Sequence, residues 1–188
     1  MTTDPDWIRQ AQQGDAEAWA RIVQEYQQPV FRLAYLLLGD ADDAEDVAQE
    51  TFIRAYRALG RFDPERPIRP WLLRIATNAA YNWQRSFGRY LAAVERHLRG
   101  EPAPPPTDQQ VEQRQEAAAL WQALRNLNPM DRQVILLRYF LESSESEMAE
   151  VLRVPAGTVK SRLHRALGRL RQALPEQPPE GLQEGIDG

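Results

Sequence analysis

The segment VPAGTVKSRLHRA, residues 154–166, decides how the rest of the chain is interpreted. Pro155 suits the first position of a helix, because its φ is already fixed near the helical value and its missing N–H is not needed there. Apolar residues then recur at helical spacing, which predicts a helix with one buried side formed by Val159, Leu163, Leu167 and Leu170.

The other side of this predicted helix is basic and polar. Between Arg153 and Arg171 there are six basic residues and no acid, although the whole chain has a net charge of −4. Such a helix fits the major groove of DNA, where the base edges would be faced by Lys160, Ser161, His164 and Arg165. Phosphates would be contacted by flanking side chains and by N–H groups at the helix start, namely Arg153, Arg162, Arg169, Gly157 and Thr158.

A shorter helix is predicted just before this one. Ser144 and Glu147 have the Ser-x-x-Glu spacing of a capping box, and small Ala149 permits a close helix crossing. The turn at Arg153 is tight, so the two helices are expected to form a helix-turn-helix. An ordinary pair of packed helices is the alternative, and the tight turn and basic face favour DNA binding over it.

The first half of the chain predicts a helical bundle with its own core. Apolar residues recur there every three or four positions, and prolines exclude a helix interior across residues 61–70. The expected helices cover residues 4–28 (with a possible break at 14–15), 29–39, 41–60 and a run from Trp71. Periodicity returns at Val111, and Asn128-Pro129 signals a further helix start.

An acidic run at residues 40–46 opens the third of these helices. One interpretation is capping with a solvated face, because acids offset the helix dipole in the first turn. The other is a protein-docking surface on which Val47, Phe52 and Ile53 turn inward while the partner is met by Asp43, Asp46, Gln49 and Glu50. The residues alone favour the first interpretation.

Residues suited to unpaired bases surround the proline-rich segment. Phe62 lies in that segment, and the helix that follows carries Arg74, Asn78, Asn82 and Arg85. Aromatic rings stack on bases, amides bond base edges, and arginines neutralise phosphates. The alternative is that the aromatic residues of this region are core residues of a small helical domain.

Composition excludes several classes of site. The chain has no cysteine and two histidines, so no disulfide, metal site or cysteine nucleophile is expected. No nucleophile–base pair or phosphate loop is evident, which predicts a protein without enzymatic activity, cofactor or small-molecule substrate. Without a signal sequence or an apolar run of ~20 residues, the expected location is cytoplasmic.

Three stretches carry a resemblance to a known family. Residues 43–52 (DAEDVAQETF), 71–78 (WLLRIATN) and 155–163 (PAGTVKSRL) resemble, in order, signature stretches of extracytoplasmic-function (group 4) RNA polymerase sigma factors of the sigma-70 family. The resemblance implies an all-α protein of two small helical domains joined by a flexible Pro-rich linker. The implied parts are region 2 at 5–90, the linker at 91–112, region 4 at 113–174 and a disordered acidic tail at 175–188.

The same resemblance implies a function. The acidic helix would dock on the coiled coil of the largest subunit of core RNA polymerase, which reverses the preference stated above. Phe62 and Asn78 would capture a flipped base of the −10 promoter element, and the helix at 155–170 would read the −35 element. An anti-sigma factor is an expected partner beside polymerase and promoter DNA. A stand-alone helix-turn-helix regulator is the alternative function.

Two features depart from the family pattern. Arg153 stands in the turn where the family often has glycine, and a left-handed conformation there would cost ~1 kcal/mol. Pro64, Pro67 and Pro70 make the expected base-capturing loop stiff.

Overall fold

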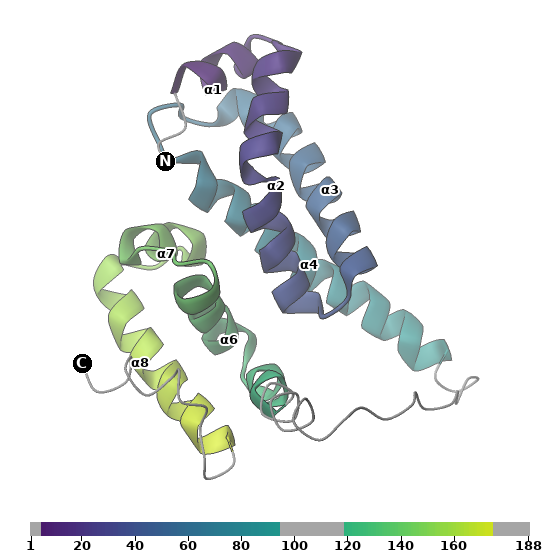
Figure 1. Cartoon of the computed structure of the whole chain (residues 1–188), viewed down its shortest axis with the longest axis vertical. Coiled ribbons are helices and arrows are strands. Elements are labelled where there is room, and N and C mark those ends of the chain that lie inside the picture. Colours follow the sequence, from purple (N-terminus) through teal and green to yellow (C-terminus); the bar gives the residue numbers. More distant parts are fainter. Residues whose placement is uncertain (1–4, 95–118, 175–188) are drawn as a thin grey trace, which may run out of the picture.

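The computed structural model describes residues 5–94 and 119–174, with side chains for 6–85 and 119–174. All elements in these two stretches are helices, so the predicted all-α fold is confirmed. The N-terminal domain contains α1 (Pro5–Gln12), α2 (Ala16–Leu38), α3 (Ala41–Ala58), the 3-10 helix η1 (Leu59–Arg61) and α4 (Ile68–Val94). The C-terminal domain contains helical residues 119–126, α6 (Pro129–Ile135), the π-helix η2 (Leu136–Phe140), α7 (Glu145–Leu152) and α8 (Ala156–Ala173) (Figure 1).

The predicted linker and tail fall almost wholly outside the described residues. Residues 91–94 of the predicted linker are the last turn of α4, and its remainder and the tail at 175–188 are not described. Within the described stretches, no helix has the length and apolar character that a membrane span requires.

Helix α2 continues without interruption through Pro29, so the helix start predicted there is wrong. The break predicted at 14–15 is confirmed, because α1 ends at Gln12 and the Asp15 carboxylate caps the start of α2. Gly39, with φ of 81°, ends α2. Proline in a helix interior removes the bond to the carbonyl of Glu25 and costs ~3 kcal/mol. The buried stripe continues on both sides of Pro29, and its packing outweighs that loss: Ile22, Tyr26, Val30, Leu33 and Leu37.

Helices α3 and α4 pack on α2 and complete the N-terminal core. Helix α4 begins at Ile68, three residues before the predicted start. Pro70 therefore lies in its first turn, where a missing N–H does no harm. Phe52 is half-buried as expected, whereas Ile53 is 46% exposed, so its predicted inward orientation is wrong.

The capping signals of the C-terminal domain are confirmed. The Asn128 side chain accepts the N–H of Asp131 at 2.9 Å, and Ser144 with Glu147 forms a complete capping box. Arg153 ends α7 in the left-handed region with φ of 54° and ψ of 47°, so the chain tolerates this conformation at the turn rather than avoiding it. The local sequence therefore determines where these helices begin and end.

Arg153→Gly is expected to stabilise the protein by ~1 kcal/mol, because glycine adopts the left-handed conformation without the Cβ penalty. Urea unfolding of the full chain measures the effect. Arg153→Ala is the control, because it removes the same charge but keeps the strained φ. Equal stability of the two variants would show that the turn conformation carries no strain.

The two domains lie against each other along α4. Figure 1 shows α7 beside the first half of α4, and the two helices are in contact. The Tyr81 hydroxyl donates to the Pro129 carbonyl at 2.8 Å, and buried Gln133 donates to Thr77 at 3.2 Å. Buried apolar residues of both domains form one continuous cluster. The side of α4 that carries predicted functional residues is therefore partly an interdomain surface.

Candidate functional site

A groove of about 1030 Å³ lies between α3 and α4. Three of the four predicted docking residues line it: Asp46, Gln49 and Glu50, but not Asp43, which lies in the first turn of α3. They recur at i, i+3 and i+4, so helical spacing places them along one face of α3. Ile53 and Arg54 continue that face one turn further and were missed, although their i+7 and i+8 positions would have predicted them.

One hydrogen-bonded pair of side chains lies on each of the two helices that line this groove. Glu50 accepts a hydrogen bond from Arg54 at 2.6 Å, and Asn82 accepts one from Arg85 at 2.7 Å. The groove therefore presents carboxylates beside the exposed side chain of Ile53, a combination suited to a helical partner with basic and apolar residues.

The groove also contains two residues that were predicted to contact unpaired bases. Asn82 and Arg85 line it together with Asp46 and Glu50, whereas Phe62, Arg74 and Asn78 line other cavities. The predicted −10 set is therefore divided between two surfaces. Helical spacing along α4 did not predict this division, because it depends on which neighbouring helix each turn of α4 faces.

Phe62 is half-buried in the loop between η1 and α4. Its ring lies on Trp71 with centroids 4.6 Å apart, and the Gln12 side chain donates to the carbonyls of Leu59 and Phe62 at 2.9 and 2.7 Å. The loop is thus held by a long-range contact from α1. A cavity of about 270 Å³ beside the ring is bounded by Arg66, Arg74 and, from α7, Glu150.

Asn78 is exposed on α4 and lines a second cavity of about 270 Å³ with Arg74, Thr77 and Tyr81. The opposite wall belongs to the C-terminal domain: Met130, Gln133, Val151, Leu152 and Arg153. Nothing in the sequence pairs these residues with α4, because they are separated from it by the predicted linker.

Arginines concentrate positive charge between the two cavities. Burial lowers the pKa of Arg74 from its ordinary value, and the neighbouring Arg153 and Arg66 lower it further. The guanidinium remains protonated at any physiological pH. The three arginines lie near Glu150 of α7. If the Glu150 carboxylate moved away, this part of the surface would suit phosphates.

Helix α8 has the two faces that its sequence predicts. Val159, Leu167 and Leu170 are buried and Leu163 is half-buried, whereas the proposed base-contacting side chains are exposed: Lys160, Ser161, His164 and Arg165. The Ser161 hydroxyl donates to the Thr158 carbonyl at 3.1 Å, and Arg165 Nε donates to the Ser161 carbonyl at 3.2 Å. The exposed face is thus basic and partly pre-ordered by the helix itself.

Several predicted phosphate contacts are engaged within the domain instead. Arg162 is half-buried, with Nη1 3.5 Å from the Met130 sulfur, and Arg169 forms an ion pair with buried Asp131. The Thr158 N–H donates to the Pro155 carbonyl at 2.8 Å, whereas Gly157 is exposed at the helix start.

Comparison with known proteins gives the same division into two parts. Residues 22–90 match the family Sigma-70 region 2, and residues 117–170 match Sigma-70, region 4. The ECF RNA polymerase sigma factor SigW of Bacillus subtilis (strain 168) is 37% identical, over 89% of this chain and 94% of that protein. The ECF RNA polymerase sigma factor SigE of Mycolicibacterium smegmatis is 34% identical, over 96% of this chain and 76% of that protein.

Solved structures extend the likeness to both domains. CnrH, in a complex with the cytosolic domain of CnrY, has a TM-score of 0.68 and 28% identity, over 90% of this chain and 96% of that chain. With two sigma-70 regions in order and homologous sigma factors aligned along nearly the whole chain, this protein belongs to the extracytoplasmic-function RNA polymerase sigma factors of the sigma-70 family.

Proposed function

We propose that this sigma factor uses three separate surfaces to bind polymerase, duplex promoter DNA and melted promoter DNA. The groove between α3 and α4 docks on the coiled coil of the largest polymerase subunit, α8 reads the −35 duplex, and Phe62 with Asn78 captures melted −10 bases. Residues 5–90 and 113–174 are assigned to these two promoter elements as regions 2 and 4, with 91–112 as their linker. One observation carries the proposal: the groove that presents Asp46 and Glu50 and the basic face of α8 lie on separate surfaces of one chain.

The two carboxylates of the groove support polymerase docking over DNA binding there, although Arg54 and Arg85 line it as well. Asp46 and Glu50 would repel phosphates, whereas they attract a basic helical partner. Asn82 and Arg85 share the groove and are assigned to the same docking surface rather than to −10 recognition. A stand-alone regulator would leave this groove without a role.

The exposed face of α8 supports duplex recognition. Lys160 and Arg165 are long donors five positions apart on α8, and both suit the acceptor atoms of guanine in the major groove. Arg162, Arg169 and the Thr158 amide are engaged within the domain, so Gly157 and Arg153 are left as the stronger phosphate candidates.

The Phe62–Asn78 surface supports capture of unpaired bases. Phe62 and Trp71 provide aromatic faces, Asn78 provides an amide, and Arg74 provides positive charge between them. Captured bases favour strand separation because the melted state gains contacts that the duplex lacks. The chain therefore acts by binding, without bond chemistry or a cofactor.

Regulation is proposed by analogy with relatives. The CnrH structure contains the cytosolic domain of CnrY, and an anti-sigma partner of this kind is proposed for this chain as well. Because the proposed partners are polymerase and chromosomal promoters, the protein is expected to act in the cytoplasm.

Asn78→Ala is expected to lower open-complex formation about 5- to 150-fold, because losing an amide bond to a base costs ~1–3 kcal/mol. Closed-complex binding should change little, since Asn78 contacts only melted DNA. Permanganate footprinting of holoenzyme on a supercoiled promoter measures melting, and a gel shift at low temperature measures closed complexes. Asn126→Ala, at an exposed position of the C-terminal domain, is the control. Equal loss in both assays would contradict base capture.

A further inference from the structure

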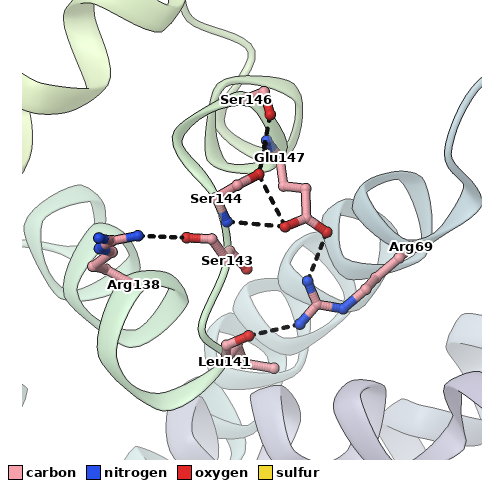
Figure 2. Close-up of polar contacts among 7 residues, drawn as sticks. All are labelled: Arg69, Arg138, Leu141, Ser143, Ser144, Ser146 and Glu147. Carbon is pink, nitrogen blue, oxygen red and sulfur yellow. Dashed lines mark hydrogen bonds and ion pairs between the residues drawn. The ribbon is translucent and has the colours of Figure 1, made fainter. Parts of the chain in front are cut away.

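Arg69 joins the two domains by two short bonds. Its guanidinium donates to the Glu147 carboxylate at 2.7 Å and to the Leu141 carbonyl at 2.6 Å (Figure 2). The Arg69 and Glu147 side chains are only 26% and 25% exposed, so solvent screens this ion pair less than an ordinary surface pair. Arg66 makes a parallel but more exposed contact with Glu150 at 3.2 Å.

Glu147 is positioned for Arg69 by its own helix. The Ser144 N–H donates to Glu147 Oε2 at 2.9 Å in the capping box, while Oε1 faces Arg69 (Figure 2). Burial acts to raise the pKa of Glu147, but the Ser144 hydrogen bond and Arg69 outweigh it, so the pKa lies below its ordinary value. The carboxylate is therefore charged at neutral pH and loses the contact only as the pH falls through that lowered pKa.

Closure of the two domains places residues of the C-terminal domain along one functional surface and leaves another open. Glu150 on α7 bounds the Phe62 cavity, and Gln133, Val151 and Arg153 form the far wall of the Asn78 cavity. Among the described residues, those that line the groove containing Asp46 and Glu50 all belong to α3 and α4. In the described arrangement the C-terminal domain therefore narrows the cavities beside Phe62 and Asn78, although the Asn78 side chain is itself exposed, while the proposed docking groove stays accessible.

We propose that Arg69 is a latch that holds the free protein closed until polymerase has docked. The proposal rests on the function assigned above to Asn78 and Phe62. Closure brings Arg153 near Arg74, and their repulsion opposes the latch, whereas the Arg66–Glu150 ion pair supports it. A modest difference in affinity of polymerase for the open form would then release it, because a ligand shifts such an equilibrium by its differential affinity.

The distance between the domains tests the latch directly. The chain has no cysteine, so Gln24→Cys on α2 and Gln172→Cys on α8, both exposed, accept spin labels in the full-length protein. Pulsed electron resonance should give one short distance population for the parent. Arg69→Ala should add a longer, broader population, and an unchanged distance would overturn the proposal. Glu147→Gln, which keeps an acceptor for Ser144, should act in the same way.

Arg138→Ala is the matched control. Arg138 belongs to the same cluster, but it donates to the Ser143 carbonyl of its own domain at 3.3 Å (Figure 2). Its removal should leave the distance unchanged, and opening by this variant as well would show that any weakening of the cluster suffices and that Arg69 is no latch. Circular dichroism confirms that each variant is folded.

Binding of a fluorescent single-stranded −10-type oligonucleotide to the free protein supplies the second readout. Arg69→Ala should raise its affinity about tenfold, or ~1.4 kcal/mol, because a site that is narrowed in the closed form binds with reduced apparent affinity. Asn78→Ala in the same background should remove that gain. Opening without any gain would support the latch and contradict the role of Asn78, whereas no opening would overturn the latch whatever the role of Asn78.

Discussion

Replacing Asp46 and Glu50 together with arginine is expected to abolish binding to core RNA polymerase while leaving the protein folded. Both carboxylates line the groove between α3 and α4, and two reversed charges would face the basic residues proposed on the partner. Like charges brought together across an interface cost several kcal/mol, so affinity should fall at least ~100-fold. Titration of labelled core polymerase with each protein measures the change.

The fold should survive this double reversal. The Glu50–Arg54 ion pair has both side chains 44% exposed, and such helix pairs contribute only about 0.3–0.5 kcal/mol. Glu17→Arg with Glu25→Arg is the matched control, because both positions are exposed on α2 and the change in net charge is the same. Holoenzyme formation by the groove variant, or equal loss in the control, would show that the groove is not the docking surface.

Lys160→Ala and Arg165→Ala are each expected to weaken binding at a matching −35 element by ~1–3 kcal/mol, or about 5- to 150-fold. Both side chains are exposed on α8, on the face opposite its buried stripe. Base contacts carry the discrimination between sequences, so each variant should also tolerate substitutions at one or two positions of the element. A promoter library transcribed with purified holoenzyme measures affinity and preference together.

Two controls make this prediction specific. Arg171→Ala removes a positive charge from an exposed position nearer the end of α8 and should cost much less. A uniform loss on every sequence would instead assign Lys160 or Arg165 to phosphates. The same variants assayed without polymerase address the stand-alone regulator, because tight, operator-specific binding by a dimer of the free protein would contradict the proposed dependence on polymerase.

Local chemistry made the helix boundaries of the C-terminal domain predictable. A cap is a contact within four residues, so Asn128, the Ser144–Glu147 box and the turn at Arg153 could be identified before any tertiary structure was known. The two faces of α8 were predictable for the same reason, since helical spacing alone separates its buried and exposed residues.

Predictions failed where packing outweighed a local preference. Pro29 signals a helix start, yet α2 continues through it because the apolar stripe on either side is buried against α3 and α4. Ile53 was expected inside, yet its turn of α3 faces the groove. In both cases the decisive energy comes from neighbours that are distant in sequence.

The sequence by itself determined an all-α chain with two helical domains, a helix with a basic face and an acidic helix on a separate domain. These properties follow from spacing and charge, which act over a few residues. Only the tertiary structure decided that Asn82 belongs with Asp46, that Asn78 faces the C-terminal domain, and that Arg69 meets Glu147 across 78 positions. Such contacts depend on how the helices pack against one another, and periodicity within one helix contains no information about which neighbour each turn will face.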